Sequence, residues 1–139
     1  MNLQNVLKTY FGYDEFRLGQ DELIEGIVDG RDALGIMPTG GGKSLCYQLP
    51  AIAFDGITLV ISPLISLMKD QVDSLNEIGI SATYINSSIG NKELLEILDD
   101  VREYKYRIIY VAPERLNTSS FINLARDINI CFIAVDEAH

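Results

Sequence analysis

The chain alternates between short runs rich in apolar residues and longer segments in which apolar residues recur every three or four positions. Runs of the first kind predict strands that are buried on both faces, and they cover Ala33–Met37, Ile57–Ile61, Ser81–Ile85, Arg107–Val111 and Ile130–Val135. Segments of the second kind predict helices, and they cover Leu3–Phe11, Asp21–Asp29, Leu45–Phe54, Leu64–Ile78, Lys92–Tyr104 and Phe121–Arg126. This alternation predicts an α/β fold with a largely parallel sheet and helices on both faces.

A glycine-rich turn links the first predicted strand to the helix that follows it. Its residues are Met37-Pro38-Thr39-Gly40-Gly41-Gly42-Lys43-Ser44. The glycines let backbone N–H groups close around phosphate oxygens, because no Cβ blocks the approach. Lys43 can reach the β- and γ-phosphates of a nucleotide, and the Ser44 hydroxyl can bind Mg²⁺. The usual phosphate loop opens with Gly where this chain has Met37, and the plain alternative is a glycine-rich turn after a core strand.

An acidic pair follows the last predicted strand, in the sequence Asp136-Glu137-Ala138-His139. In a parallel sheet the carboxyl ends of the strands share one edge, where ligands bind. Asp136 would therefore lie near the phosphate loop and hold Mg²⁺, directly or through water. Glu137 would orient and deprotonate the attacking water. The alternative is a solvated acidic strand end.

Composition limits the classes of partner and compartment. The 139 residues suit a single domain, and the net charge of −9 argues against strong non-specific DNA binding by this segment alone. No apolar stretch approaches the roughly twenty residues that span a bilayer, and the N-terminus lacks the pattern of a signal peptide. Cys46 and Cys131 have no metal-ligand spacing. We expect a cytoplasmic protein, in a bacterial cytosol or nucleoid, without a membrane partner.

The acidic motif resembles that of superfamily 2 helicases, and further stretches resemble the RecQ family of DNA helicases. The phosphate loop continues as Leu45-Cys46-Tyr47-Gln48-Leu49-Pro50, which is similar to the RecQ loop. Three other stretches resemble the family's adenine-recognition motif, motif Ia and motif Ib, and these are Phe11–Gln20, Ser62–Gln71 and Tyr110–Leu116. The resemblance implies a RecA-like P-loop NTPase lobe that is truncated after the Asp-Glu-Ala-His strand.

The resemblance also implies residue roles beyond the phosphate loop. It assigns the adenine to Tyr13, Arg17 and Gln20. Without the resemblance, the simpler interpretation is that Tyr13 and Phe16 form a helix-end staple and that Gln20 is a polar residue at a helix start. It assigns the nucleotide to Thr39, Gly40, Gly41, Gly42, Lys43 and Ser44, catalysis to Lys43, Asp136 and Glu137, and the metal to Ser44 and Asp136. It assigns contacts with the DNA backbone to Ser62, Pro63, Ser66, Lys69 and Arg115. His139 would couple hydrolysis to DNA binding.

The function that the resemblance implies is 3'-5' unwinding of DNA driven by ATP hydrolysis, in DNA repair and recombination. Residues 1–31 would carry the adenine-recognition motif, and residues 32–139 would form a partial nucleotide-binding core. ATP and Mg²⁺ would be the cofactors, and single-stranded and duplex DNA the partners of the full-length parent. The second RecA-like lobe is absent from this chain, so the chain alone is expected to be a poor enzyme. An RNA helicase of the same superfamily and a non-catalytic nucleotide-binding module stay open as alternatives.

Overall fold

The computed structural model describes residues 3–16, 24, 45–53 and 56–135. Contacts divide the chain into two compact units, residues 1–54 and 55–139. The predicted strand Ala33–Met37, the predicted helix Asp21–Asp29 except for Ile24, and the expected boundary at residues 31/32 lie outside the described residues. Among the helices that are described, none is long and apolar enough to cross a membrane.

The first unit contains the predicted N-terminal helix and the helix after the phosphate loop. The N-terminal helix is confirmed, but its second half is a π-helix, so that α1 (Leu3–Val6) continues into η1 (Leu7–Phe11). Gly12 ends it with a φ of 76°, and its N–H donates to the Lys8 carbonyl at 3.2 Å. The other helix, α3, covers Leu45–Ala53. The core of this unit consists of Val6, Leu7, Ile24 and Leu49.

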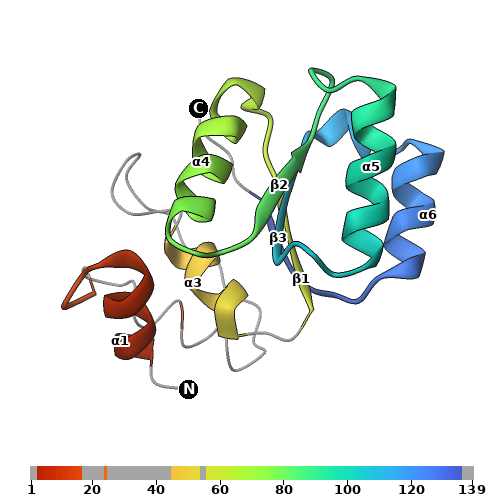
Figure 1. Cartoon of the computed structure of the whole chain (residues 1–139). Helices are drawn as coiled ribbons and strands as arrows, with labels where there is room; N and C mark the ends of the chain where they lie inside the picture. The colour runs from red at the N-terminus through yellow and green to blue at the C-terminus, as the bar shows by residue number, and fades with distance from the viewer. Residues whose placement is uncertain (1–2, 17–23, 25–44, 54–55, 136–139) are drawn as a thin grey trace. The chain divides into compact units, whose positions relative to one another are not determined.

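The second unit is built on a four-stranded parallel sheet (Figure 1). Its strands are β1 (Ile57–Ile61), β2 (Ala82–Ile85), β3 (Ile108–Val111) and β4 (Ile130–Val135), in the order β2-β3-β1-β4. Its helices are α4 (Ile65–Glu77), α5 (Asn91–Arg102), the 3-10 turn η2 (Pro113–Arg115) and α6 (Ser119–Asp127). The parallel sheet predicted from the sequence is therefore confirmed for these four strands.

Helices cover both faces of this sheet, with α4 on one side and α5 and α6 on the other (Figure 1). Successive strand residues point to opposite faces, so the residues at alternate positions belong to different layers. Ile57 and Leu59 of β1 join the core with Ile109 of β3 and with buried residues of α5 and α6. Tyr110, the next residue of β3, points the other way and donates its hydroxyl to Gln71 of α4 at 3.4 Å.

The exposure of β4 and the end of α5 differ from the sequence prediction. The strand β4 was predicted to be buried on both faces, but Ile133 and Val135 are 54% and 66% exposed. Among the described strands β4 pairs with β1 alone, so it forms an edge of that sheet. The helix α5 ends at Arg102, before the predicted Tyr104. Tyr104 has a φ of 59°, which a continuing helix does not allow.

Gly56 holds the start of β1 close to the segment that leads into β4. Its φ is 129°, and a Cβ at this position would lie 2.9 Å from both the side-chain nitrogen Nδ2 and the backbone carbonyl oxygen of Asn129. The same carbonyl accepts a hydrogen bond from the Ile57 N–H at 3.0 Å. The absence of a side chain at Gly56 thus permits the pairing of β1 with β4.

Candidate functional site

Most residues predicted to bind the nucleotide lie outside the described residues. They are Arg17, Gln20, Thr39, Gly40, Gly41, Gly42, Lys43, Ser44, Asp136 and Glu137, and the predicted coupling residue His139 also lies outside the described residues. The described part of the adenine motif includes Tyr13, whose side chain is 54% exposed. An exposed aromatic ring is available to stack on a base. The strand β4 ends at Val135, immediately before Asp136 in the sequence.

The second unit places Ser62 directly after β1 and the turn that carries Arg115 directly after β3, while Ser66 and Lys69 lie on α4. In a parallel sheet the carboxyl ends of all strands lie on the same side of the sheet. Ser62 follows β1, Ala112 follows β3, and between them in sequence Asn86 follows β2. Ligands of open α/β sheets bind beyond this side, so its described polar groups form the candidate nucleic-acid interface.

Ser62 and Pro63 form the turn between β1 and α4. The Ser62 hydroxyl oxygen accepts a hydrogen bond from the Leu64 N–H at 3.2 Å, and the residue is 5% exposed. Pro63 is exposed, and its carbonyl accepts from the Ile65 N–H at 3.1 Å. Ser62 therefore shapes the start of α4, while its hydroxyl proton can still be donated to a ligand.

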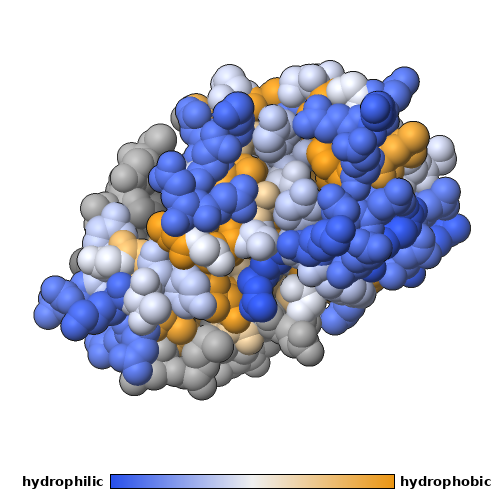
Figure 2. All heavy atoms as spheres, viewed as in Figure 1, coloured by the Kyte–Doolittle hydropathy of each residue, from blue (hydrophilic) through white to orange (hydrophobic). Residues whose placement is uncertain are grey.

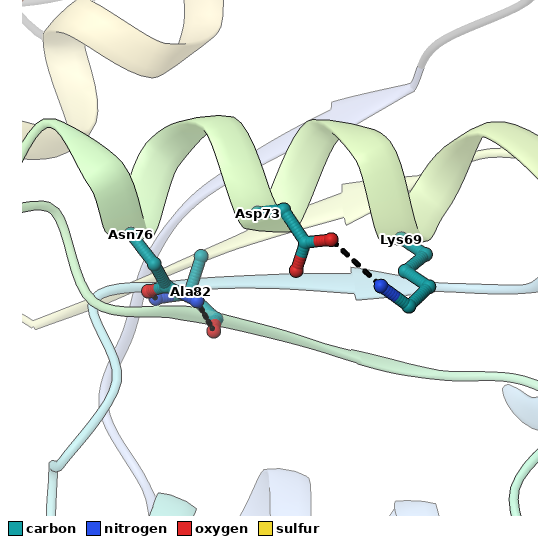
Figure 3. Close-up of polar contacts among 4 residues, drawn as sticks. All are labelled: Lys69, Asp73, Asn76 and Ala82. Carbon is teal, nitrogen blue, oxygen red and sulfur yellow. Dashed lines mark hydrogen bonds and ion pairs between the residues drawn. The ribbon is translucent and has the colours of Figure 1, made fainter.

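The helix α4 presents Ser66 and Lys69 to solvent, three residues apart and hence on one side of the helix. Its opposite side is buried through Met68, Val72 and Leu75. The Lys69 ammonium lies 2.8 Å from a carboxylate oxygen of Asp73, one turn further along (Figure 3). This hydrogen bond and the charge of Asp73 raise the pKa of Lys69 above its ordinary value, so the side chain is cationic at neutral pH. A nucleic-acid phosphate would have to compete with Asp73 for it.

Arg115 lies at the end of η2 and is half-buried. Its guanidinium donates a hydrogen bond from Nη2 to the backbone carbonyl of Asn86 at 2.9 Å. The Arg115 carbonyl in turn accepts from the Thr118 hydroxyl at 2.6 Å. Sequence reasoning had left Asn86 unassigned. Its signal was an Asn directly after a buried strand and two residues before a Ser, which is typical of an Asx turn.

The surface over α5 is hydrophilic and carries several carboxylates. Figure 2 shows hydrophilic side chains gathered there, and the acidic ones that are exposed are Glu93, Glu96, Asp99 and Glu103. Lys105, near the end of the helix, pairs with Glu103 at 3.0 Å and with Asp100 at 3.1 Å, and these contacts raise its pKa. Clustered carboxylates repel a phosphate backbone. These carboxylates disfavour a phosphate backbone over α5, but α4 also exposes Asp70, Asp73 and Glu77, so the charge of the two helices does not distinguish them.

Comparison with known proteins places these features in context. The family model described as DEAD/DEAH box helicase matches residues 17–139. The chain is 53% identical to "ATP-dependent DNA helicase RecQ" of Bacillus subtilis, over 98% of this chain and 23% of that protein. It is 52% identical to the protein of the same name in Haemophilus influenzae, over 97% of this chain and 22% of that protein. The chain thus spans less than a quarter of the length of these relatives.

Solved structures agree on the fold. A crystal structure of the DUF1998 helicase MrfA superposes with a TM-score of 0.70, at 23% sequence identity, over 97% of this chain and 23% of that one. This likeness supports the RecA-like α/β architecture. The family match covers far more than half of the chain, and the chain belongs to the DEAD/DEAH box helicase family.

Proposed function

We propose that this chain is the ATP-binding part of an ATP-dependent DNA helicase of the RecQ kind. The observation that carries the proposal is the identity of 53% over nearly the whole chain with a protein named as such a helicase. DEAD/DEAH box helicases use ATP, and the sequence from Met37 to Ser44 has the chemistry of a phosphate loop. The full-length protein would unwind DNA in the 3'-5' direction and act in the cytosol, where its DNA lies.

In this proposal the nucleotide is held from both ends. Tyr13, Arg17 and Gln20, within residues 1–31, take the adenine, because an aromatic ring and a guanidinium plane can sandwich a purine and an amide can pair with its edge. Residues 32–139 form the nucleotide-binding core. There Thr39, Gly40, Gly41, Gly42, Lys43 and Ser44 surround the phosphates. These roles rest on the residue types, their order and the resemblance.

The proposed chemistry belongs to residues at the carboxyl ends of the strands. Ser44 and Asp136 would hold Mg²⁺, which draws charge from the phosphates when bound. Glu137 would take a proton from the attacking water, and Lys43 would stabilise charge on the transferred phosphoryl group. His139 would pass the state of the nucleotide to the DNA-binding parts. Arginine fingers and a second lobe would come from parts of the full-length protein beyond this chain.

The DNA backbone would contact Ser62, Pro63, Ser66, Lys69 and Arg115. The described geometry supports this in one respect, because these residues lie after β1, on α4 and after β3. The contacts would be hydrogen bonds and charge pairs to phosphate, which position DNA but carry no base sequence.

Unwinding assays on the full-length protein test the proposal. Matched 3'-tailed duplexes of DNA and of RNA are compared with ATP, with ATP omitted, and with a Glu137→Gln variant as the hydrolysis control. We expect ATP-dependent unwinding of DNA that the variant lacks. Preferred unwinding of RNA would favour the RNA-helicase alternative. Nucleotide binding without turnover on either substrate would favour a non-catalytic module.

A further inference from the structure

Asn86 is the first residue after β2, and its side chain is almost completely buried. It is 1% exposed, although an amide is costly to bury without partners. The side-chain oxygen accepts hydrogen bonds from the N–H and the hydroxyl of Ser88, the first at 2.8 Å. The side-chain nitrogen donates to the sulfur of Met68 on α4 at 3.4 Å. Both ends of the amide are therefore used.

The backbone of Asn86 makes a further contact with a predicted DNA-binding residue. Its carbonyl oxygen accepts a hydrogen bond from Nη2 of Arg115 at 2.9 Å, across 29 positions of sequence. The same carbonyl accepts weakly from the Ile89 N–H at 3.5 Å. Asn86 thus joins the segments that follow three different strands: α4 after β1, its own turn after β2, and η2 after β3.

This arrangement restricts the long side chain of Arg115 without using up its donors. A guanidinium has five N–H donors, and the contact with the Asn86 carbonyl uses only the Nη2 nitrogen. An arginine that is already held in one rotamer loses less conformational entropy when it binds a phosphate. The direction in which the Asn86 carbonyl points is set by its turn, and the turn is closed by the buried amide.

We propose that Asn86 is a positioning residue for nucleic-acid binding, which acts through Arg115. Its amide fixes the turn after β2 and ties that turn to Met68 of α4, the helix that carries Ser66 and Lys69. Its carbonyl then holds the Arg115 guanidinium at a fixed place relative to α4. The inference rests on the proposed function, in that it takes Arg115 as a contact with the DNA backbone.

A second asparagine of the same unit provides a matched control. Asn76, near the end of α4, donates to the Ala82 carbonyl at 3.2 Å and accepts from the Ala82 N–H at 2.9 Å (Figure 3). It therefore joins α4 to the start of β2, whereas Asn86 follows the end of the same strand. Replacing either asparagine by alanine removes the same chemical group, together with at least one hydrogen bond to backbone.

The experiment measures binding of a fluorescent dT oligonucleotide by the full-length protein, together with DNA-stimulated ATPase activity. The variants are Asn86→Ala, Arg115→Ala, the double variant and Asn76→Ala. Releasing one rotamer-rich side chain should weaken DNA binding by Asn86→Ala about two- to tenfold. The ATPase rate at saturating DNA should stay near that of the wild type. The double variant should bind no more weakly than Arg115→Ala, and Asn76→Ala should bind like the wild type.

Two results would overturn the positioning role, and a third bears on the proposed function instead. Additive losses in the double variant, or an equal loss in Asn76→Ala, would show that Asn86 does not act through Arg115. Unchanged binding by Arg115→Ala would instead refute the DNA contact itself. If Asn86→Ala does not fold, Asn86→Ser replaces it, since its hydroxyl can still accept from the Ser88 N–H but the shorter side chain loses the contact with Met68. That variant should bind DNA more weakly than the wild type and no more weakly than Arg115→Ala, and binding equal to the wild type would contradict the proposal.

Discussion

Replacing Gly56 by alanine tests how β4, the strand that leads into Asp136, is held against β1. The new Cβ would lie 2.9 Å from the Asn129 carbonyl oxygen, which bonds the Ile57 N–H, and 3.4 Å from the Cβ of Cys131. The crowding atoms include backbone, which cannot move aside as a flexible side chain can. The substitution should therefore strain the β1–β4 pairing as well as the local turn.

The size of the effect follows from two separable terms. A non-glycine residue at positive φ costs about 1–3 kcal/mol, and overpacking adds about 1–3 kcal/mol. Gly79 separates them, because its φ is 92° but a Cβ there meets no atom within 4 Å. Gly79→Ala should therefore be destabilised only by the cost of a non-glycine residue at positive φ. Gly56→Ala should be less stable than Gly79→Ala by about 1–3 kcal/mol.

Urea denaturation of residues 1–139, followed by circular dichroism, measures this difference. With a slope of about 1–3 kcal/mol per molar urea, the midpoints of the two variants should differ by about 1 M. Gly56→Ala should have the lower midpoint. Equal midpoints would show that Gly56 does not approach Asn129 closely, and the β1–β4 register described above would then be wrong.

Three further predictions concern ligands. Gln20→Ala in the full-length protein should erode a preference for ATP over GTP in steady-state hydrolysis, because a bidentate pair with adenine is worth about 1–3 kcal/mol; equal use of GTP by the wild type would count against the adenine assignment. Asp73→Asn should free Lys69 and steepen the salt dependence of single-strand binding, by up to about 0.7 in log–log slope. The same charge change in Asp99→Asn, on α5, should not do so, and equal slopes would remove Lys69 from the interface. Residues 1–139 alone should release phosphate negligibly, with or without DNA, since arginine fingers are worth about 10³–10⁵ in rate; turnover near that of the full-length protein would contradict this.

Much of the fold was predictable because the apolar runs are continuous. The strands Ile57–Ile61 and Ile130–Val135 have the bounds predicted from the sequence. Helix ends were predicted less well, because local polar contacts decide them. Helix α6 begins at Ser119, two residues before the prediction, where the Thr118 hydroxyl oxygen accepts from the Phe121 N–H at 3.4 Å. The exposure of β4 depends on strand order, which periodicity does not determine.

In the candidate interface too, some features could be predicted from the sequence and others depend on the fold. The resemblance to motifs Ia and Ib assigned Ser66, Lys69 and Arg115 to the candidate interface without any knowledge of the fold. The contact between Arg115 and Asn86 could not be predicted, since it depends on β2 and β3 being neighbours in the sheet. The pairing of Lys69 with Asp73 follows from a spacing of four residues on a helix, and the sequence contained that signal.

In the function proposed here, Lys43 and its loop bind the phosphates of ATP in a DNA-dependent motor. The most direct test is steady-state phosphate release by the full-length protein, with and without single-stranded DNA, for the wild type and Lys43→Ala. Lys43 carries the positive charge that the loop places against the phosphates. We predict DNA-stimulated hydrolysis by the wild type and none above background by Lys43→Ala, with its fold intact by circular dichroism. Full activity in Lys43→Ala would contradict the proposed role of Lys43 in ATP hydrolysis.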